Sequence, residues 1–240
     1  MFRGMADDDW KVLPHEPIEK LSENLWRVVG SIERTVMKRV MTVARLGDGR
    51  LVIHSAIALD EPSMRQLEAW GTPAFLIVPN RWHRIDAPRF KRRYPQLKVL
   101  TPPRGRKLVA TVVPVDATHD DFGGDAQVRL EPLAGLGDGE QVLRVRSKDG
   151  VTLVLNDCVF NMDKPSRFVE RTVLTLLGSA PGPRVSRLFK AAVVKDRDAF
   201  RADLERLAAT PDLVRVIVAH DRLSTGAQAA ATLRQAATYV

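Results

Sequence analysis

The stretch LVIHSAIALDEPSMRQLEAWGTPAFLIVPNRWHRIDAPRFKRRYPQLKVL, residues 51–100, alternates short apolar runs with amphipathic segments. The runs at 51–55, 75–78 and 97–100 predict three strands. The segments between them predict helices, because their apolar residues recur at helical spacing and each begins with an aspartate two positions before a proline, a typical helix start. The stretch is therefore a βαβαβ unit, whose right-handed crossovers make the strands parallel.

Strands without intervening helices are predicted on both sides of this unit. The runs LWRVVGSI and MKRVMTVARL precede a Gly-Asp-Gly turn and predict adjacent antiparallel strands. Runs around Val112, 127–130 and 142–145 lie between Gly/Asp-rich turns and lead to VTLVL. A helical region near 166–177, a helix capped by Asp196, the strand VRVIVA and an alanine-rich helix complete the chain.

The two halves of the chain follow the same plan. Each offers antiparallel strands followed by strands interleaved with helices, so two such halves can pack sheet to sheet with their helices outside. We therefore expect one α/β domain over residues 1–240, with residues 1–20 as a poorly ordered or extended N-terminal arm. The 240 residues, 45% of them hydrophobic, suffice for a sizeable core.

Two features that the sequence lacks limit the expected location of the protein and the metal sites it can form. No apolar run approaches the roughly 20 residues that cross a bilayer, and the start MFRGMADDDWKVLPHEP has no apolar signal core. We expect a cytoplasmic protein without a membrane partner. Cys158 is the only cysteine, which excludes an internal disulfide and a multi-cysteine zinc site, so His and carboxylate side chains would have to hold any metal.

The formal net charge of +8 arises from residues 81–107, where ten Lys and Arg residues accompany one acid, Asp86. Such a segment would attract small anions and would bind nucleic acid weakly and salt-dependently. The alternative is a solvated helix face with a basic loop. Aromatic residues make up only 6% of the chain and no nucleic-acid motif is present, so nucleic acid is the less favoured partner.

Polar side chains follow several of the predicted strands. Three of the five histidines, His54, His83 and His220, stand at or just beyond strand ends, and Asp157 follows the strand VTLVL. The carboxyl ends of parallel strands open into a common crevice. These side chains are therefore the candidates for a functional site.

The segments VLNDCVFN and VIVAHDRL, after a central and a late strand, resemble those of the metallo-β-lactamase-like hydrolase superfamily. VIHSAIALDEP followed by FLIVPNRWHRIDAPRF is similar to a branch known only as a domain of unknown function. The resemblance runs from about Leu25 to His220. It implies a four-layer αββα sandwich of two mixed β-sheets with helices outside, and a divalent metal site.

In active superfamily members the pattern is His-x-His-x-Asp-His, then Gly-His, an Asp and a terminal His. Asp157 and His220 match the last two. The positions of the first run are held instead by Asn80, Trp82, Arg84 and Ile85. His83 is one residue out of register, and the Gly-His region corresponds to 132–136, which contains no histidine.

These replacements limit the metal chemistry that the resemblance implies. A dinuclear site needs several imidazoles, whereas a catalytic zinc needs three protein ligands and one open position. We expect at most one weakly held divalent metal (zinc, iron or manganese) or none, with Asp157 and His220 catalytic and either His83 or His54 completing the ligand set. Residues expected to contact an anionic substrate are His54, Asn80, Arg81, Trp82 and Arg84.

Three functions remain open at this point. The first is a metallo-β-lactamase-like hydrolase with a degenerate metal site. The second is a non-catalytic protein that binds an anionic metabolite, because a guanidinium at Arg84 opposes a cation and suits an anion. The third is a basic nucleic-acid-binding surface.

Overall fold

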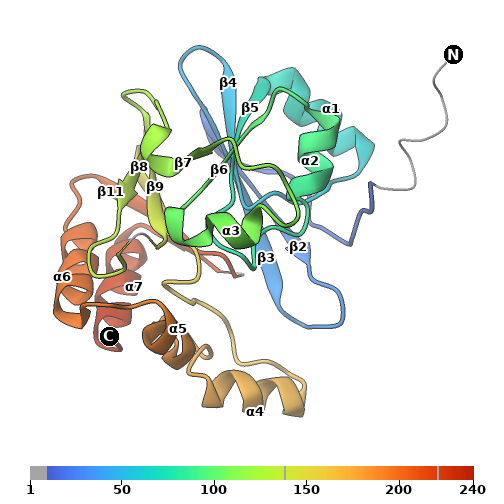
Figure 1. Cartoon of the computed structure of the whole chain (residues 1–240). Coiled ribbons are helices and arrows are strands. Elements are labelled where there is room, and N and C mark those ends of the chain that lie inside the picture. Colours follow the sequence, from blue (N-terminus) through green and yellow to red (C-terminus); the bar gives the residue numbers. More distant parts are fainter. Residues whose placement is uncertain (1–9, 138, 221) are drawn as a thin grey trace, which may run out of the picture.

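The computed structural model describes residues 10–137, 139–220 and 222–240. Two β-sheets lie face to face with helices on their outer sides (Figure 1). The predicted α/β architecture of two mixed sheets is thereby confirmed. Within the described residues, no helix is long and apolar enough to span a membrane.

The first sheet has seven strands in chain order and contains the βαβαβ unit. Its strands are β1 (Glu19–Ser22), β2 (Leu25–Ser31), β3 (Lys38–Arg45), β4 (Arg50–His54), β5 (Thr72–Ile77), β6 (Lys98–Thr101) and β7 (Ala117–Thr118). β1 to β4 pair antiparallel, β4 to β6 pair parallel as predicted for the crossovers, and β7, which was not predicted, pairs parallel with β6. Its helices are α1 (Glu61–Trp70), α2 (Ala87–Arg93) and α3 (Arg106–Val109).

The second sheet has five strands in the order β12-β11-β10-β9-β8. These are β8 (Val128–Pro132), β9 (Gln141–Ser147), β10 (Gly150–Val154), β11 (Leu213–Ile217) and β12 (Leu223–Thr225). Only β10 and β11 pair parallel. The accompanying helices are α4 (Phe168–Leu176), α5 (Arg187–Ala192), α6 (Arg197–Ala208) and α7 (Ala227–Ala237).

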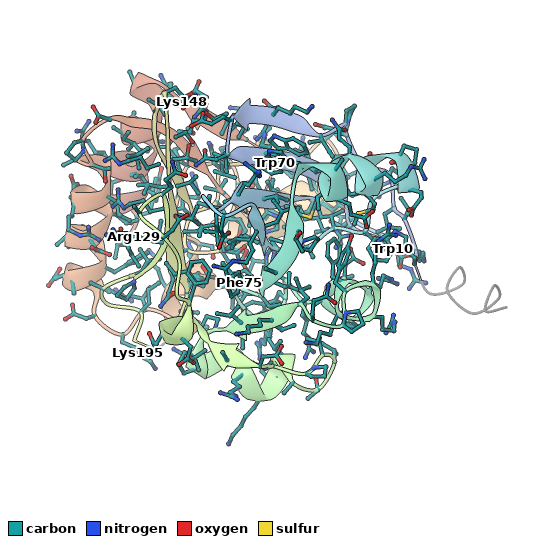
Figure 2. The ribbon with its side chains drawn as sticks, turned by 90° about the horizontal axis from the view of Figure 1, so that it is seen from above. Trp10, Trp70, Phe75, Arg129, Lys148 and Lys195 are labelled. Carbon is teal, nitrogen blue, oxygen red and sulfur yellow. The ribbon has the colours of Figure 1, made fainter. Side chains whose placement is uncertain are left out.

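Three apolar clusters correspond to the interfaces between four layers. One joins the first sheet to α1 and α2, and another joins the second sheet to α5, α6 and α7. The third lies between the sheets and includes Phe75, which is seen in the interior in Figure 2. The αββα layering therefore follows from strands that bury both faces.

Two of the expected helix caps are confirmed and one is wrong. Asp60 accepts the Ser63 N–H, and Asp196 caps α6 in the same way. Asp86 precedes α2 but makes no capping bond, because its carboxylate binds the buried Arg39. The run around Val112 is a turn after α3 rather than a strand.

The chain before β1 packs against the first sheet. The Trp10 indole donates to the Leu59 carbonyl at 2.8 Å, and His15 forms an isolated bridge with Gly30. Residues 1–9 of the predicted arm lie outside the described residues.

Candidate metal centre

Loops from both sheets carry side chains to one point beyond their strand ends. His83 lies on the loop after β5, Asp157 follows β10 and His220 follows β11. One ligand atom from each of the three lies within 4.8 Å of the others. The structure thus brings together the three residues that the sequence proposed as metal ligands.

Asp157 is the centre of this group. Its Oδ1 lies 3.1 Å from His83 Nε2 and 3.2 Å from His220 Nε2. Burial raises the pKa of this carboxyl, but the electrostatic interaction with His83 and the hydrogen bonds with His220 and His83 outweigh burial and hold the pKa well below its usual range. Asp157 is therefore an ionised, acceptor-only group pointing at both imidazoles.

The second ring nitrogen of each histidine also has a partner. His220 Nδ1 lies 2.7 Å from the Lys38 carbonyl, and His83 Nδ1 lies 2.7 Å from Ser55 Oγ. A carbonyl only accepts, so His220 Nδ1 carries a hydrogen. Metal-binding histidines are oriented by such contacts, which leave Nε2 to face the ion.

Burial lowers the pKa of the His220 imidazolium, but the hydrogen bond and charge of Asp157 outweigh it and the pKa is raised above its ordinary value. A neutral His220 would place an Nε2 lone pair against the Asp157 carboxylate. The contact therefore requires a positive species between the two atoms, either a proton or a metal ion.

Glu140 is a member of the site that the sequence reasoning missed. It is buried at the start of β9 and accepts hydrogen bonds from Asn80, Asn156 and the Cys158 N–H. Burial and the charge of Asp157 raise the pKa of Glu140 to about 8, although all three hydrogen bonds favour its ionised form. The sequence signal was an acid directly before a buried strand adjacent to the strand that leads to Asp157.

The segment 132–136, matched in the sequence to the Gly-His region, contributes to the core and not to the site. Within 132–136, Leu133 and Leu136 are buried in the cluster under α6, so this segment is core. Gly139 and Glu140, just beyond it, stand where the chain enters the site.

Asn80 links the two carboxylates. Its Nδ2 donates to Asp157 Oδ2 at 2.7 Å and also to Glu140 Oε1. Its Oδ1 accepts the backbone N–H groups of Trp82 and His83, at 2.8 and 3.2 Å. This tight turn places His83 in reach of Asp157 despite its shifted position in the sequence.

Two other predicted site residues, Arg84 and His54, lie outside the ligand group. The Arg84 guanidinium binds the Leu108 carbonyl and Thr111, and thus turns toward α3 rather than the metal group. His54 is buried outside the ligand group, and burial, with a smaller electrostatic effect of the nearby His83 ring, lowers its pKa to about 3, so it is neutral. The expectations of Arg84 as a residue of the site and of His54 as a ligand are therefore not supported by the geometry.

A cavity of about 170 Å³ lies beside the site. Asn80 and Glu140 contribute to its lining, together with Arg81, Trp82 and Arg104. Trp82 is 47% exposed, and the Arg81 guanidinium lies 4.4 Å from its ring centre. The cavity therefore joins an exposed arginine and tryptophan to the buried polar group.

The fold is that of the metallo-β-lactamase class of proteins. Structures similar over most of the chain include a metallo-β-lactamase from Pontibacter korlensis, with 13% identity, a TM-score of 0.60 and coverage of 94% of this chain and 99% of the other. The mono-zinc form of FIM-1 from Pseudomonas aeruginosa has 10% identity, a TM-score of 0.60 and coverage of 95% and 96%. An Erythrobacter litoralis metallo-β-lactamase has 12% identity, a TM-score of 0.60 and coverage of 92% and 95%.

The chain accordingly has a metallo-β-lactamase-like fold, as the sequence resemblance implied. No protein-family model matches it, and no curated protein does either.

Replacing Glu140 with glutamine is expected to flatten the pH dependence of the free energy of unfolding. Folded Glu140 retains a proton from its ordinary pKa of 4.5 up to about 8, whereas the unfolded chain has lost it, so stability falls as the pH rises across this interval. One such group contributes a slope of up to about 1.4 kcal/mol per pH unit. Urea denaturation at several pH values within the interval measures it, and equal slopes for both proteins would contradict the raised pKa.

Proposed function

We propose that this protein is a hydrolase of the metallo-β-lactamase fold that binds one divalent metal ion through His83, Asp157 and His220. The observation that carries the proposal is the convergence of the three ligand atoms within 4.8 Å. Two histidines and one carboxylate are a donor set typical of catalytic zinc, which leaves a position open for water.

The residues fit such an ion. Both imidazoles direct Nε2 toward Asp157 Oδ1, and their Nδ1 atoms are held by Lys38 and Ser55. The His220 contact in particular needs a positive species at its Nε2. A divalent ion would satisfy both nitrogens and the carboxylate at once.

The surroundings favour one ion rather than two. The Asn80 amide nitrogen donates hydrogen bonds to Asp157 Oδ2 and Glu140 Oε1. A second ion would use these same carboxylate oxygens, which the amide N–H groups already occupy. An amide nitrogen that donates cannot serve as a ligand. Glu140, with its pKa raised to about 8, remains largely neutral near pH 7 and adds little attraction for a second cation.

The ion, when bound, would supply Lewis acidity and lower the pKa of a water molecule. Asp157, an ionised acceptor, would help to hold the ion and would orient that water. Arg81 and Trp82, which line the adjacent cavity, would bind an anionic substrate. Arg84 is left out of this role because its guanidinium is engaged elsewhere.

Metal analysis tests the proposal. Protein purified from zinc-supplemented medium is expected to contain about one equivalent of metal, and Asp157→Ala to contain about a tenth of that or less, because two histidines alone make an incomplete site. Asp163→Ala is the matched control, since Asp163 is an exposed partner of Arg222 six residues along the chain. Wild-type occupancy below about a tenth of an equivalent, unchanged by Asp157→Ala, would exclude the proposal.

The second candidate is a non-catalytic anion-binding protein that has lost hydrolase activity. The exposed Arg81 at the mouth of the cavity favours it. If metal is absent but phosphate or a dicarboxylate raises the melting temperature, and Arg81→Ala removes that effect, this candidate replaces the first. In the basic segment, residues 81–107, Arg89, Lys91 and Arg93 form ion pairs with acids of the fold. The segment is therefore a weaker candidate for binding nucleic acid than its composition alone indicates.

A further inference from the structure

Helix α4 presents an apolar face to solvent. Phe168 and Val169 are each 71% exposed and Leu176 is 66% exposed, with Val173 exposed between them. Val169, Val173 and Leu176 follow one another at spacings of four and three residues, so they form a stripe along one side of the helix. A surface helix normally turns such a stripe toward the core.

The opposite side of α4 is attached to the body of the protein. Leu174 is buried in a small apolar cluster with Phe160 and Met162, and the Glu170 carboxylate accepts the Val36 N–H at 3.3 Å. The helix is therefore held by one face while its apolar stripe points away. In Figure 1, α4 lies at the edge of the molecule, near the turn between β2 and β3.

The surroundings of the stripe are basic. Lys164, Arg167 and Arg171 lie just before or on the helix, and the Arg187 guanidinium donates to the Leu176 carbonyl at 3.3 Å; the same stretch holds two acids, Asp163 and Glu170. Both acids are engaged, Asp163 by Arg222 and Glu170 by the Val36 N–H. Arg167 lies 3.8 Å from Glu170 but keeps a largely exposed side chain, and the Arg171 guanidinium lies 5.4 Å from the Phe168 ring centre. The unpartnered face is therefore both apolar and positively charged.

We infer that α4 docks this protein on the surface of an anionic lipid bilayer. Phe168, Val169 and Leu176 would enter the boundary between head groups and acyl chains, and Arg167 and Arg171 would contact anionic head groups. A projecting helix needs no matching groove in a fluid surface. A second copy of the chain fits less well, because packing two such faces together would also bring their arginines together.

This inference revises the expectation of no membrane partner, which rested on the lack of a segment long enough to span a bilayer. A nine-residue helix, about 14 Å long, can lie in the interface plane without crossing it. Docking of this kind is independent of the metal centre.

Vesicle sedimentation tests the inference with the full chain. Vesicles containing phosphatidylglycerol in phosphatidylcholine are expected to bind the protein, and vesicles of phosphatidylcholine alone to bind it at least about tenfold more weakly. The triple variant Phe168→Ser, Val169→Ser, Leu176→Ser should lose about tenfold or more of the binding. Because the three side chains are exposed, folding should be unaffected, which circular dichroism would check.

A matched control changes Val12 and Val112, which are exposed elsewhere, to serine and should bind as wild type does. Phe168→Trp supplies a direct readout of insertion, since brominated lipids should quench the added fluorescence. No binding to anionic vesicles at low salt would overturn the inference. A dimer that dissociates in the triple variant, together with unchanged vesicle binding, would assign the face to a second copy instead.

Discussion

Replacing Asp86 with alanine is expected to lower the free energy of unfolding by about 3–5 kcal/mol, the usual cost of removing one partner from a buried ion pair. Asp86 is 1% exposed, and its carboxylate lies 2.5 Å from Arg39 Nη2 and 2.5 Å from Arg89 Nη1. The same carboxylate accepts the Ala58 N–H at 3.1 Å. The variant would leave the buried Arg39 guanidinium without its counter-charge and the Ala58 N–H without an acceptor.

The position of Asp86 makes this loss relevant to the site. Its contacts join β3, the loop after β4 and the start of α2. Lys38, next to Arg39, supplies the carbonyl that holds His220, and His83 lies just before α2. Asp86→Ala is therefore expected to disturb the ligand geometry as well as the stability.

Asp198→Ala is the matched control, because Asp198 and Arg201 repeat the spacing of Asp86 and Arg89 at the start of a helix. The Asp198 side chain is 92% exposed, so its ion pair should contribute less than about 1 kcal/mol. Urea denaturation of the two variants measures both losses. Equal losses in the free energy of unfolding for the two variants would show that burial of Asp86 is not the cause of the destabilisation.

The fold was predictable because its determinants are local. The strands and helices of residues 51–100 follow from the spacing of apolar residues and from the residues that start and end each element. Asp60 and Asp196 cap helices, as their positions in the sequence indicate. Asp86 has the same sequence context but a different role. Its partner Arg39 is distant in the chain, and no local sequence pattern predicts an ion pair between such distant residues.

The site was predictable to the extent that strand ends determine it. Asp157, His83 and His220 were found by the rule that side chains after parallel strands meet. Glu140 was missed because it precedes β9 rather than following a strand; β9 runs antiparallel to β10, so its start lies beside the end of β10. The orientation of Arg84 was also beyond prediction, because nearby acceptors on α3 and the following turn decide it.

Asn80→Asp is expected to be strongly destabilising without metal and to be rescued by it. The Asn80 amide donates to Asp157 Oδ2 at 2.7 Å and to Glu140 Oε1. Aspartate would replace these two donors with a third acidic group among two buried carboxylates. At a pH above about 8, the pKa to which Glu140 is raised, all three would tend to ionise, and the loss should reach about 3–5 kcal/mol.

A divalent ion would reverse this repulsion, since the variant offers three carboxylates and two imidazoles. Urea denaturation with EDTA and with zinc should therefore show a much larger metal-dependent gain for Asn80→Asp than for wild type. Asn24→Asp is the control, because Asn24 is a buried asparagine that bonds the Arg146 carbonyl and the Ser147 hydroxyl instead. It should lose stability without recovery in zinc. Equal stability of Asn80→Asp and wild type in EDTA would show that the amide does not hold the two carboxylates together, and absence of zinc rescue would count against a cation site at this point.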